Sequence, residues 1–516
     1  MISRRKILKG GVAAAVIASV PFFSFRRAFA QSVLPFDYFI APNGDDNNAG
    51  SLTSPWSITA LNSKKSVYAG KRVGIIGDVG GTQTPITYGT IGGVKTTLTS
   101  IVNGNGQQPA LNTNGGTASA STYIASCNSA GVYTPRWAII DFGTPTNQNG
   151  FGMGQNSESA AQVPNVGYTT IDGLTIRNFT YSAICFQNPG GSTLRGAVVQ
   201  NCEVYNGGGV PSNNNPGALR FWNAYGAVVH NNMIHDLSCN GGGASPVWGY
   251  NAIMCYGTLG TSIGMVITNN TTYNCSSILT KDFNSDFANC SYNYLDHGKF
   301  GSAAQSDEDI GIGVVVGHTP FTGVTSVFHH NICLGLFQAF PQAVNSPAVA
   351  GTCQIYHNTF YGTANYANFD ALYCKDGSAA AAIQFYNNIV YAANGYEQGG
   401  NAGCVYVDPS FAAANATFNN NVYGSNGNAC KFSRAEYAGL TLASWRSSTG
   451  LDQNSVSVSA SPFTGTPTGQ TPSSFAVGSS AVIGGVTCGA LDGSGTVGCN
   501  FGSSGPVPMA PALKVS

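Results

Sequence analysis

The stretches AVVHNNMIH, residues 227–235, and MVITNNTTY, residues 265–273, share one pattern. In each of them, short runs of β-forming residues flank an asparagine pair, and Asn232 and Asn270 occupy the same place. Such runs predict short strands, and Asn suits the turn between them because it tolerates the left-handed backbone conformation. Recurrence of one such unit predicts a repeat fold.

Nine copies of this unit align between residues 174 and 424, at spacings of 23 to 38 residues. Each copy is expected to form one coil of a solenoid, with neighbouring coils about 4.8 Å apart. Stacked Asn side chains can then hydrogen-bond to one another. The sequence therefore predicts an all-β parallel β-helix of about 10–12 coils. The aligned turn position is predicted at Asn178, Cys202, Asn232, Asn270, Asn293, Asn331, Asn358, Asn388 and Asn421.

This pattern resembles the right-handed parallel β-helix superfamily of carbohydrate-active proteins, which has the pectate-lyase-like fold. The segment DYFIAPNGDDNNAGSLTSPWSITAL, residues 37–61, is similar to the entry segment common in that superfamily. The resemblance extends over residues 37–425 and implies the right-handed β-helix fold. It also implies a polysaccharide as the substrate or ligand.

The first thirty residues have the form of a twin-arginine export signal. Arg4 and Arg5 precede the apolar run GVAAAVIASVPFF, and AFA before Gln31 suits a signal peptidase. We therefore expect the twin-arginine export machinery to deliver the chain to the periplasm or outside the cell, with no membrane span in the mature chain. Beyond this signal peptide, residues 1–30, we expect an entry segment with early coils (31–165), central coils (166–439) and a C-terminal tail packed on the helix (440–516).

Charge and cysteine content restrict the function classes. Six of the 22 basic residues lie in the signal, which leaves 16 basic against 22 acidic residues and a formal net charge of −6. This balance argues against general binding of nucleic acid or anionic membranes. None of the fourteen cysteines is spaced as Cys-x-x-Cys, so a zinc site gains little support. Cys488 and Cys499 are the first pair to test as a disulfide.

A second strand is expected after each Asn unit, and its residues alternate between the two faces. With Ile184, Leu219, Ile253 and Ile278 facing inward, two outward rows follow. One row contains Cys185, Arg220, Met254 and Leu279. The next row contains Gln187, Trp222, Tyr256 and Lys281. A slip of one residue would turn Lys281 inward, and because a buried unpaired lysine is costly, the first register is favoured.

The loops around Lys281 support a site on this face. The two longest spacings, both 38 residues, flank its coil, and long excursions from a regular solenoid often carry function. The Lys-Asp pair recurs at Lys375-Asp376, so a turn role for it stays open. The predicted substrate-binding residues are Gln187, Trp222, Asp307, Glu308 and Asp309, of which the last three form the densest acidic cluster in the chain.

The leading hypothesis is a polysaccharide lyase. β-Elimination on a uronic acid needs a base for the C5 proton, a cation for the carboxylate and an acid for the leaving oxygen. Lys281 or Arg220 is the expected base, and Tyr256 the expected acid. In calcium-dependent pectate lyases of this fold a lysine base sits beside an aspartate-bound calcium, so the resemblance implies Ca²⁺ at Asp282 and Asp286. Both aspartates are equally suited to capping a turn. No organic cofactor is expected.

Two alternatives stay open. A glycoside hydrolase needs two carboxylates across the substrate. A non-catalytic glycan-binding protein needs only the aromatic wall. His230 and His329 share one ladder position, but Thr268 and Ser291 lie between them, so we expect solvated histidines rather than metal ligands. The carboxylate candidates for a hydrolase are Asp236, Asp282, Asp307, Glu308 and Asp309.

Overall fold

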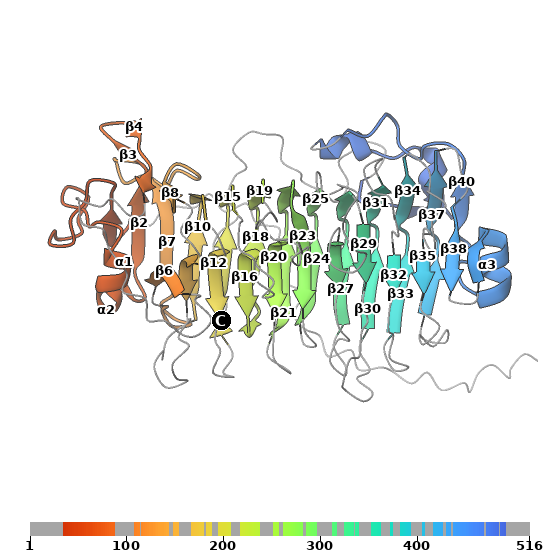
Figure 1. Ribbon diagram of the computed structural model, residues 1–516, viewed down its shortest axis with the longest axis horizontal. Helices are drawn as coiled ribbons and strands as arrows, with labels where there is room; N and C mark the ends of the chain where they lie inside the picture. Colours follow the sequence, from red (N-terminus) through yellow and green to blue (C-terminus); the bar gives the residue numbers. More distant parts are fainter. Residues whose placement is uncertain are drawn as a thin grey trace, which may run out of the picture.

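The computed structural model is a parallel β-helix, in which coils follow one another along the long axis (Figure 1). Its strands form three sheets of twelve strands each, so the predicted fold and coil number are confirmed. The structure describes residues 35–87, 108–113, 115–143, 148–153, 167–179, 182–187, 194–207, 217–237, 251–256, 262–281, 285–296, 312–316, 325–334, 336–339, 352–362, 372–374, 382–393, 405–407, 416–426, 430–434, 437–468, 471–484 and 486–491. The expected signal peptide lies outside these ranges.

The three sheets are named in the order in which a coil visits them. The first contains β1 (Tyr38–Ile40), β2 (Arg72–Ile76), β7 (Thr122–Cys127), β10 (Thr169–Asp172), β14 (Ala197–Gln200), β18 (Val228–His230), β21 (Ser262–Thr268), β24 (Ser285–Ser291), β27 (Thr325–His329), β30 (Thr352–Tyr356), β33 (Ala382–Tyr386) and β36 (Ala416–Asn419). The second contains β5 (Ile86–Thr87), β8 (Ile139–Asp141), β11 (Thr175–Arg177), β15 (Glu203–Tyr205), β19 (Met233–His235), β22 (Thr271–Tyr273), β25 (Tyr294–Asp296), β28 (Ile332–Leu334), β31 (Thr359–Gly362), β34 (Ile389–Ala392), β37 (Val422–Ser425) and β40 (Val456–Val458).

The third sheet contains β6 (Gln108–Thr113), β9 (Gln148–Met153), β12 (Ser182–Gln187), β16 (Gly217–Trp222), β20 (Asn251–Tyr256), β23 (Ser276–Lys281), β26 (Ile312–Val316), β29 (Leu336–Ala339), β32 (Leu372–Cys374), β35 (Val405–Val407), β38 (Phe432–Arg434) and β39 (Tyr437–Leu440). The smaller elements are α1 (Ala60–Ser63), α2 (Lys65–Tyr68), α3 (Leu442–Thr449), β3 (Asp78–Val79), β4 (Thr82–Gln83), β13 (Leu194–Arg195), β17 (Ala224–Tyr225), β41 (Val482–Ile483), β42 (Val486–Thr487) and two short 3-10 helices at Pro472–Phe475 and Ser479–Ala481.

A buried asparagine ladder joins the first and second sheets. Asn232 Nδ2 donates to Asn270 Oδ1 at 2.9 Å, and Asn270 Nδ2 donates to Asn293 Oδ1 at 3.0 Å. The same bond repeats coil by coil to Asn421, whose amide donates to the Asp452 carboxylate at 3.1 Å. Every amide therefore has partners, which is the condition for burying a polar row. The predicted ladder is confirmed over these coils.

Asn178 was aligned wrongly. Asp172 pairs with Gln200, so Leu174 takes the ladder position beside Cys202. Asn178 instead follows β11 with φ 57°. It begins a second row of left-handed residues, which continues through Asn206, Asp236 and Asn274. Because both corners of the coil favour Asn, the residue type alone does not tell which corner it occupies.

The core lies inside the coil and runs the length of the helix. Inward residues such as Ile184, Leu219 and Ile253 are fully buried in one continuous cluster. In the described part of the chain, nine cysteines are free, buried thiols. Cys488 is one of them and donates to the Asn420 carbonyl at 3.2 Å, so the expected bond to Cys499 is not formed. Among the described residues, no helix has the length and apolar character needed to cross a membrane.

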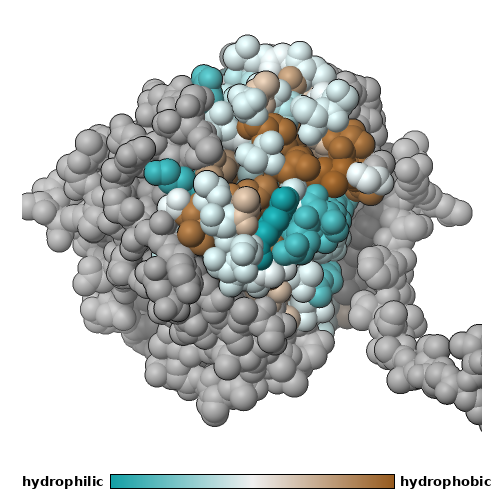
Figure 2. All heavy atoms as spheres, turned by 90° about the vertical axis from the view of Figure 1, so that its right-hand side faces the viewer, coloured by the Kyte–Doolittle hydropathy of each residue, from teal (hydrophilic) through white to brown (hydrophobic). Residues whose placement is uncertain are grey.

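The chain beyond β40 returns over the outer face of the second sheet. We call its residues 460–491 the C-terminal strap. In Figure 1 it lies at the upper right, above β31, β34 and β37, and apolar residues gather in the upper part of the C-terminal end seen in Figure 2. The Phe463 ring contacts Tyr391 at 5.8 Å between centroids, and the Phe475 ring contacts Tyr361 at 5.3 Å. The strap therefore buries an apolar part of this face.

Candidate functional site

The third sheet has the strand register that the sequence predicted. Trp222 pairs with Gln187 on one side and Tyr256 on the other, and Tyr256 pairs with Lys281. The adjoining row runs through Cys185, Arg220, Met254 and Leu279. The four members of the predicted Lys281 row thus lie on successive coils of one sheet; they are Gln187, Trp222, Tyr256 and Lys281.

Arg220 does not face open solvent, and the expectation of an exposed cation there is wrong. The residue is 4% exposed, and its neighbours Cys185 and Met254 are fully buried. Its guanidinium carbon lies 5.3 Å from the centre of the Trp222 ring. The outer face of this sheet is therefore covered at the Arg220 row, where a cation–π contact helps to stabilise the buried charge.

The remaining predicted residues lie outside the described part of the chain. These are Asp282, Asp307, Glu308 and Asp309 as whole residues, and the side chains of Gln187, Tyr256, Lys281 and Asp286. Among the residues that the structure describes, no group of three or more His, Cys, Asp or Glu side chains could hold a metal ion. The calcium site at Asp282 and Asp286 stays a prediction.

His230 and His329 are only partly exposed rather than fully solvated. Thr268 and Ser291 do separate them in the register. Both rings are half-buried, and this burial lowers the pKa of His230 and lowers that of His329 to about 4. The ring of His329 stacks on Tyr356 at 4.9 Å between centroids. These are neutral, packed imidazoles near pH 7.

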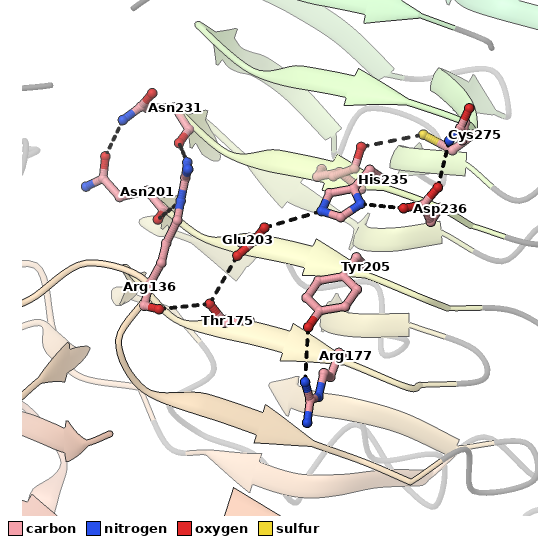
Figure 3. Close-up of polar contacts among 12 residues, drawn as sticks. Arg136, Thr175, Arg177, Asn201, Glu203, Tyr205, Asn231, His235, Asp236 and Cys275 are labelled. Atoms are coloured by element: carbon pink, nitrogen blue, oxygen red, sulfur yellow. Dashed lines mark hydrogen bonds and ion pairs between the residues drawn. The ribbon is translucent and has the colours of Figure 1, made fainter. Parts of the chain in front are cut away.

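The second sheet carries a row of polar side chains that sequence reasoning missed. It occupies one outward position on β8, β11, β15, β19 and β22, and we call it the polar column. Figure 3 shows part of this region, with the side chains of Arg177, Tyr205 and His235 on neighbouring strands. The members of the polar column are Asp141, Arg177, Tyr205, His235 and Tyr273.

Each member of the polar column contacts the next. Arg177 Nε lies 2.8 Å from Asp141 Oδ2, and Arg177 Nη1 donates to Tyr205 Oη at 3.2 Å. The Tyr205 ring stacks on His235 at 5.0 Å, and His235 stacks on Tyr273 at 4.5 Å between centroids. Stacking follows from the parallel register, which sets equivalent residues about 4.8 Å apart. The rings therefore present their edges, with the phenol oxygens, outward.

His235 lies between two carboxylates (Figure 3). Its Nδ1 is 2.9 Å from Asp236 Oδ2, and its Nε2 is 3.4 Å from Glu203 Oε1. Burial lowers the pKa of His235, but the two carboxylates together raise it above its usual value. The bond to His235 is also the main cause of a lowered pKa at Glu203. The two carboxylates thus favour the protonated form of His235, in which both ring N–H groups can donate to them.

Local backbone geometry fixes this cluster. Asp236 has φ 52°, a conformation that Asp tolerates, and its Oδ1 accepts from Asn274 Nδ2 at 2.7 Å. Arg136, with φ 60°, donates from Nε and Nη2 to the carbonyls of Asn201 and Asn231 at 3.2 and 3.3 Å. Its guanidinium also contributes to the lowered pKa of Glu203. A strained Arg136 thus ties successive coils beside the carboxylate.

A ligand can reach most of the charged groups. The Asp236 side chain is 52% exposed, and those of Arg177 and Glu203 are 29% and 28% exposed. The His235 side chain, at 10%, lies deeper. Burial, the largest cause, raises the pKa of Tyr273 to about 12, so its phenol keeps its proton near pH 7. The face therefore offers a cation, ionised carboxylates and a phenolic proton donor within four coils.

One signal in the sequence points to the polar column. Tyr205, His235 and Tyr273 each follow the ladder position of their own coil by three residues. Comparing that position across the repeats would have shown that it is charged or aromatic in consecutive coils. The sequence singled out Asp236 only as a possible hydrolase carboxylate; the structure places it against His235.

No protein-family model matches the chain, and no curated protein sequence matches it. Solved structures that it resembles include the pectate lyase Pel9A (13% identity, 74% of this chain and 78% of that chain, TM-score 0.41) and a rhamnogalacturonan lyase (12%, 88% and 96%, TM-score 0.39). Another is the lacto-N-biosidase of Eubacterium ramulus (14%, 76% and 64%, TM-score 0.31). At these identities and TM-scores the likeness assigns no activity.

Proposed function

We propose that this protein is an exported carbohydrate-active enzyme, a polysaccharide lyase that binds a uronic-acid-containing glycan along the polar column. The observation that carries the proposal is His235 held between Glu203 and Asp236 within a column of phenols and a guanidinium on a partly exposed face. Coils are about 4.8 Å apart, close to the length of one sugar unit, so each coil would meet one sugar.

The chemistry of β-elimination can be assigned to described side chains. Glu203, whose lowered pKa keeps it ionised, would take the C5 proton. Arg177 would bind the uronate carboxylate and stabilise the charge that develops on it. The C4–O bond then breaks with its electron pair on oxygen, a C4–C5 double bond forms, and Tyr205, on the same strand as Glu203, gives its phenolic proton to the leaving oxygen. Glu203 is a weak base, so the stabilisation by Arg177 would have to supply much of the rate.

The same geometry disfavours hydrolysis at this place. An inverting hydrolase needs its two carboxylates roughly 6.5–9.5 Å apart with sugar and water between them. Glu203 and Asp236 bind opposite nitrogens of one imidazole, so the His235 ring fills the space between them. Lys281, with Tyr256 as the acid, remains the alternative proposal for the lyase on the third sheet.

Incubating the mature protein with a panel of uronic-acid polysaccharides tests the proposal, with the ultraviolet absorbance of the unsaturated product as the readout. Tyr205→Phe and Glu203→Gln should each lower turnover by about 100-fold or more while the melting temperature changes little. Tyr391→Phe is the matched control, because Tyr391 continues the same outward position but is buried under the strap. It should leave turnover unchanged.

Three other outcomes are informative. Full activity of both column variants together with loss of activity in Lys281→Ala would move the site to the third sheet. Release of reducing ends without the ultraviolet product would mean a hydrolase. Binding without either product would mean a non-catalytic glycan-binding protein.

A further inference from the structure

The outward position of the polar column continues from Tyr273 to the partly exposed Asp296 and then changes character. Farther along the second sheet it is occupied by Leu334, Tyr361 and Tyr391, which are in register with one another. All three are buried and belong to an apolar cluster that includes strap residues. The same surface position is therefore polar and accessible on the N-terminal coils and apolar and covered on the C-terminal coils.

The strap reaches the coil that follows Tyr273. Its Phe475 ring lies 6.4 Å from the ring of Tyr294, which pairs with the strand of Tyr273 and is fully buried. Phe475 also contacts Phe463 at 5.7 Å and Tyr361 at 5.3 Å between centroids. A chain laid along the polar column toward the C-terminus would therefore meet the strap and its aromatic cluster beyond Asp296, where Leu334 is covered.

Backbone hydrogen bonds hold the C-terminal end of the strap against the coils. Gly489 N donates to Asn387 O at 2.9 Å, and Ala490 N donates to Thr359 Oγ1 at 3.0 Å. Gly489 has φ 88°, and a Cβ there would lie 2.6 Å from Ile389 Cδ1, so only glycine fits. The opposite end of the column differs: Thr87, which pairs with Asp141, is exposed.

We propose that the site accepts the end of a glycan chain and that the strap forms the wall against which that end stops. This inference rests on the proposed function. From Asp141 to Asp296 there are five coil steps, about 24 Å, which accommodates roughly five or six sugar units. Because the strap covers the outward position from Leu334 onward, a sugar that continued past Asp296 would collide with the strap. The enzyme should therefore shorten its polymer from one end.

The test uses the wild-type protein with oligosaccharides of two to ten units and with polymer labelled at one or the other end. Affinity should rise up to about six units and then level off, and short labelled products should come from one end only. Viscosity should fall in proportion to product. Early appearance of long internal fragments, or affinity that keeps rising beyond eight units, would overturn the inference while the proposed function stands. Absence of binding to any glycan would overturn both.

A strap variant gives a second test. Phe475→Ala removes the ring that lies against Tyr294 and Tyr361, and it should raise the share of internal cleavage at least three-fold. Val486→Ala, at a position 43% exposed on the same strap, is the matched control and should keep the wild-type product pattern. Calorimetry confirms that both variants fold; if Phe475→Ala does not, the wild-type length series decides alone. An unchanged pattern in a folded Phe475→Ala variant would show that the strap does not stop the chain.

Discussion

Replacing His235 with Phe tests the electrostatics of the site directly. Phe keeps a flat ring between Tyr205 and Tyr273 but removes both nitrogens, and with them the contacts to Glu203 and Asp236. The free-energy difference between wild type and variant then isolates the interaction of the imidazolium with its two carboxylates. Stacking with the tyrosines is largely retained in both proteins.

The sign of each contribution follows from its pKa. Glu203 has a lowered folded pKa, so its contribution is present above the unfolded value of about 4.5 and is lost as pH falls through the folded value. His235 has a raised folded pKa, so its contribution is present below the unfolded value of about 6.5 and is lost as pH rises through the folded value. The difference should be largest between about pH 4.5 and 6.5 and decrease on both sides.

The size follows from exposure. Glu203 is about one quarter exposed and Asp236 about one half, so solvent screens the second pair more strongly. Partly screened ion pairs contribute up to about 1 kcal/mol each, so we expect about 1–1.5 kcal/mol at the plateau. Urea unfolding of both proteins followed by circular dichroism from pH 3 to 9 measures the difference.

His230→Phe is the control, because burial lowers the pKa of His230 and reverses the sign: its wild-type imidazole costs stability as pH falls below about 6.5. A His235→Phe difference of equal size at pH 3, 5.5 and 9 would refute the imidazolium between two carboxylates.

Three further predictions concern the rest of the molecule. Asn293→Ala removes buried hydrogen bonds to the side-chain amide and backbone N–H of Asn270 and to the Ile267 carbonyl. It should lower the free energy of unfolding by about 3–5 kcal/mol, measured in urea, whereas Asn206→Ala at an exposed position should lower it by about 1 kcal/mol. His329 and His330 have pKa values lowered to about 4 and 3 by burial and by neighbouring imidazoles, so the native state should lose stability as pH falls below 6.5, and His330→Gln should shift acid unfolding to lower pH. Replacing Arg4 and Arg5 with Lys should leave unprocessed precursor in the cytoplasm, as cell fractionation with immunoblotting would show, if the export signal is of the twin-arginine type.

The fold was predictable because the asparagine position carries two independent constraints. Its side chain must bond to the equivalent residue of the next coil, and the residue before it turns the corner with a left-handed backbone, as Asn231 and Asn420 do, so few residues replace the pair along the ladder. The alignment failed only where one constraint disappears. Leu174 occupies the ladder position in the coil of β10 and β11, and the Asn that replaced it in the alignment belongs to the other corner. The residue type of Asn178 indicated a corner of the coil, and only the pairing of Asp172 with Gln200 showed which corner it is.

The candidate site was less predictable, because an outward residue is functional only where nothing covers it. Register was correct for Trp222, Tyr256 and Lys281, since strand alternation has a fixed period of two. Alternation does not report what packs on the outer face, and Arg220 proved buried although it faces outward. Coverage depends on the path of loops and of the strap, whose contacts join residues as far apart as Thr359 and Ala490.

Comparing the residue types at one outward position coil by coil nevertheless indicates where other segments cover the sheet. The neighbours of Arg220 in its row are Cys185 and Met254, apolar side chains that solvent would not favour, and both are buried. The outward position of the second sheet is apolar from Leu334 to Tyr391, where the strap covers it. Among the described residues, the N-terminal part of that position, from Asp141 to Asp296, combines charged and aromatic residues, several of them partly exposed. The glycan proposed above would explain this column, because partly exposed polar groups do nothing for the core and one sugar unit spans about one coil.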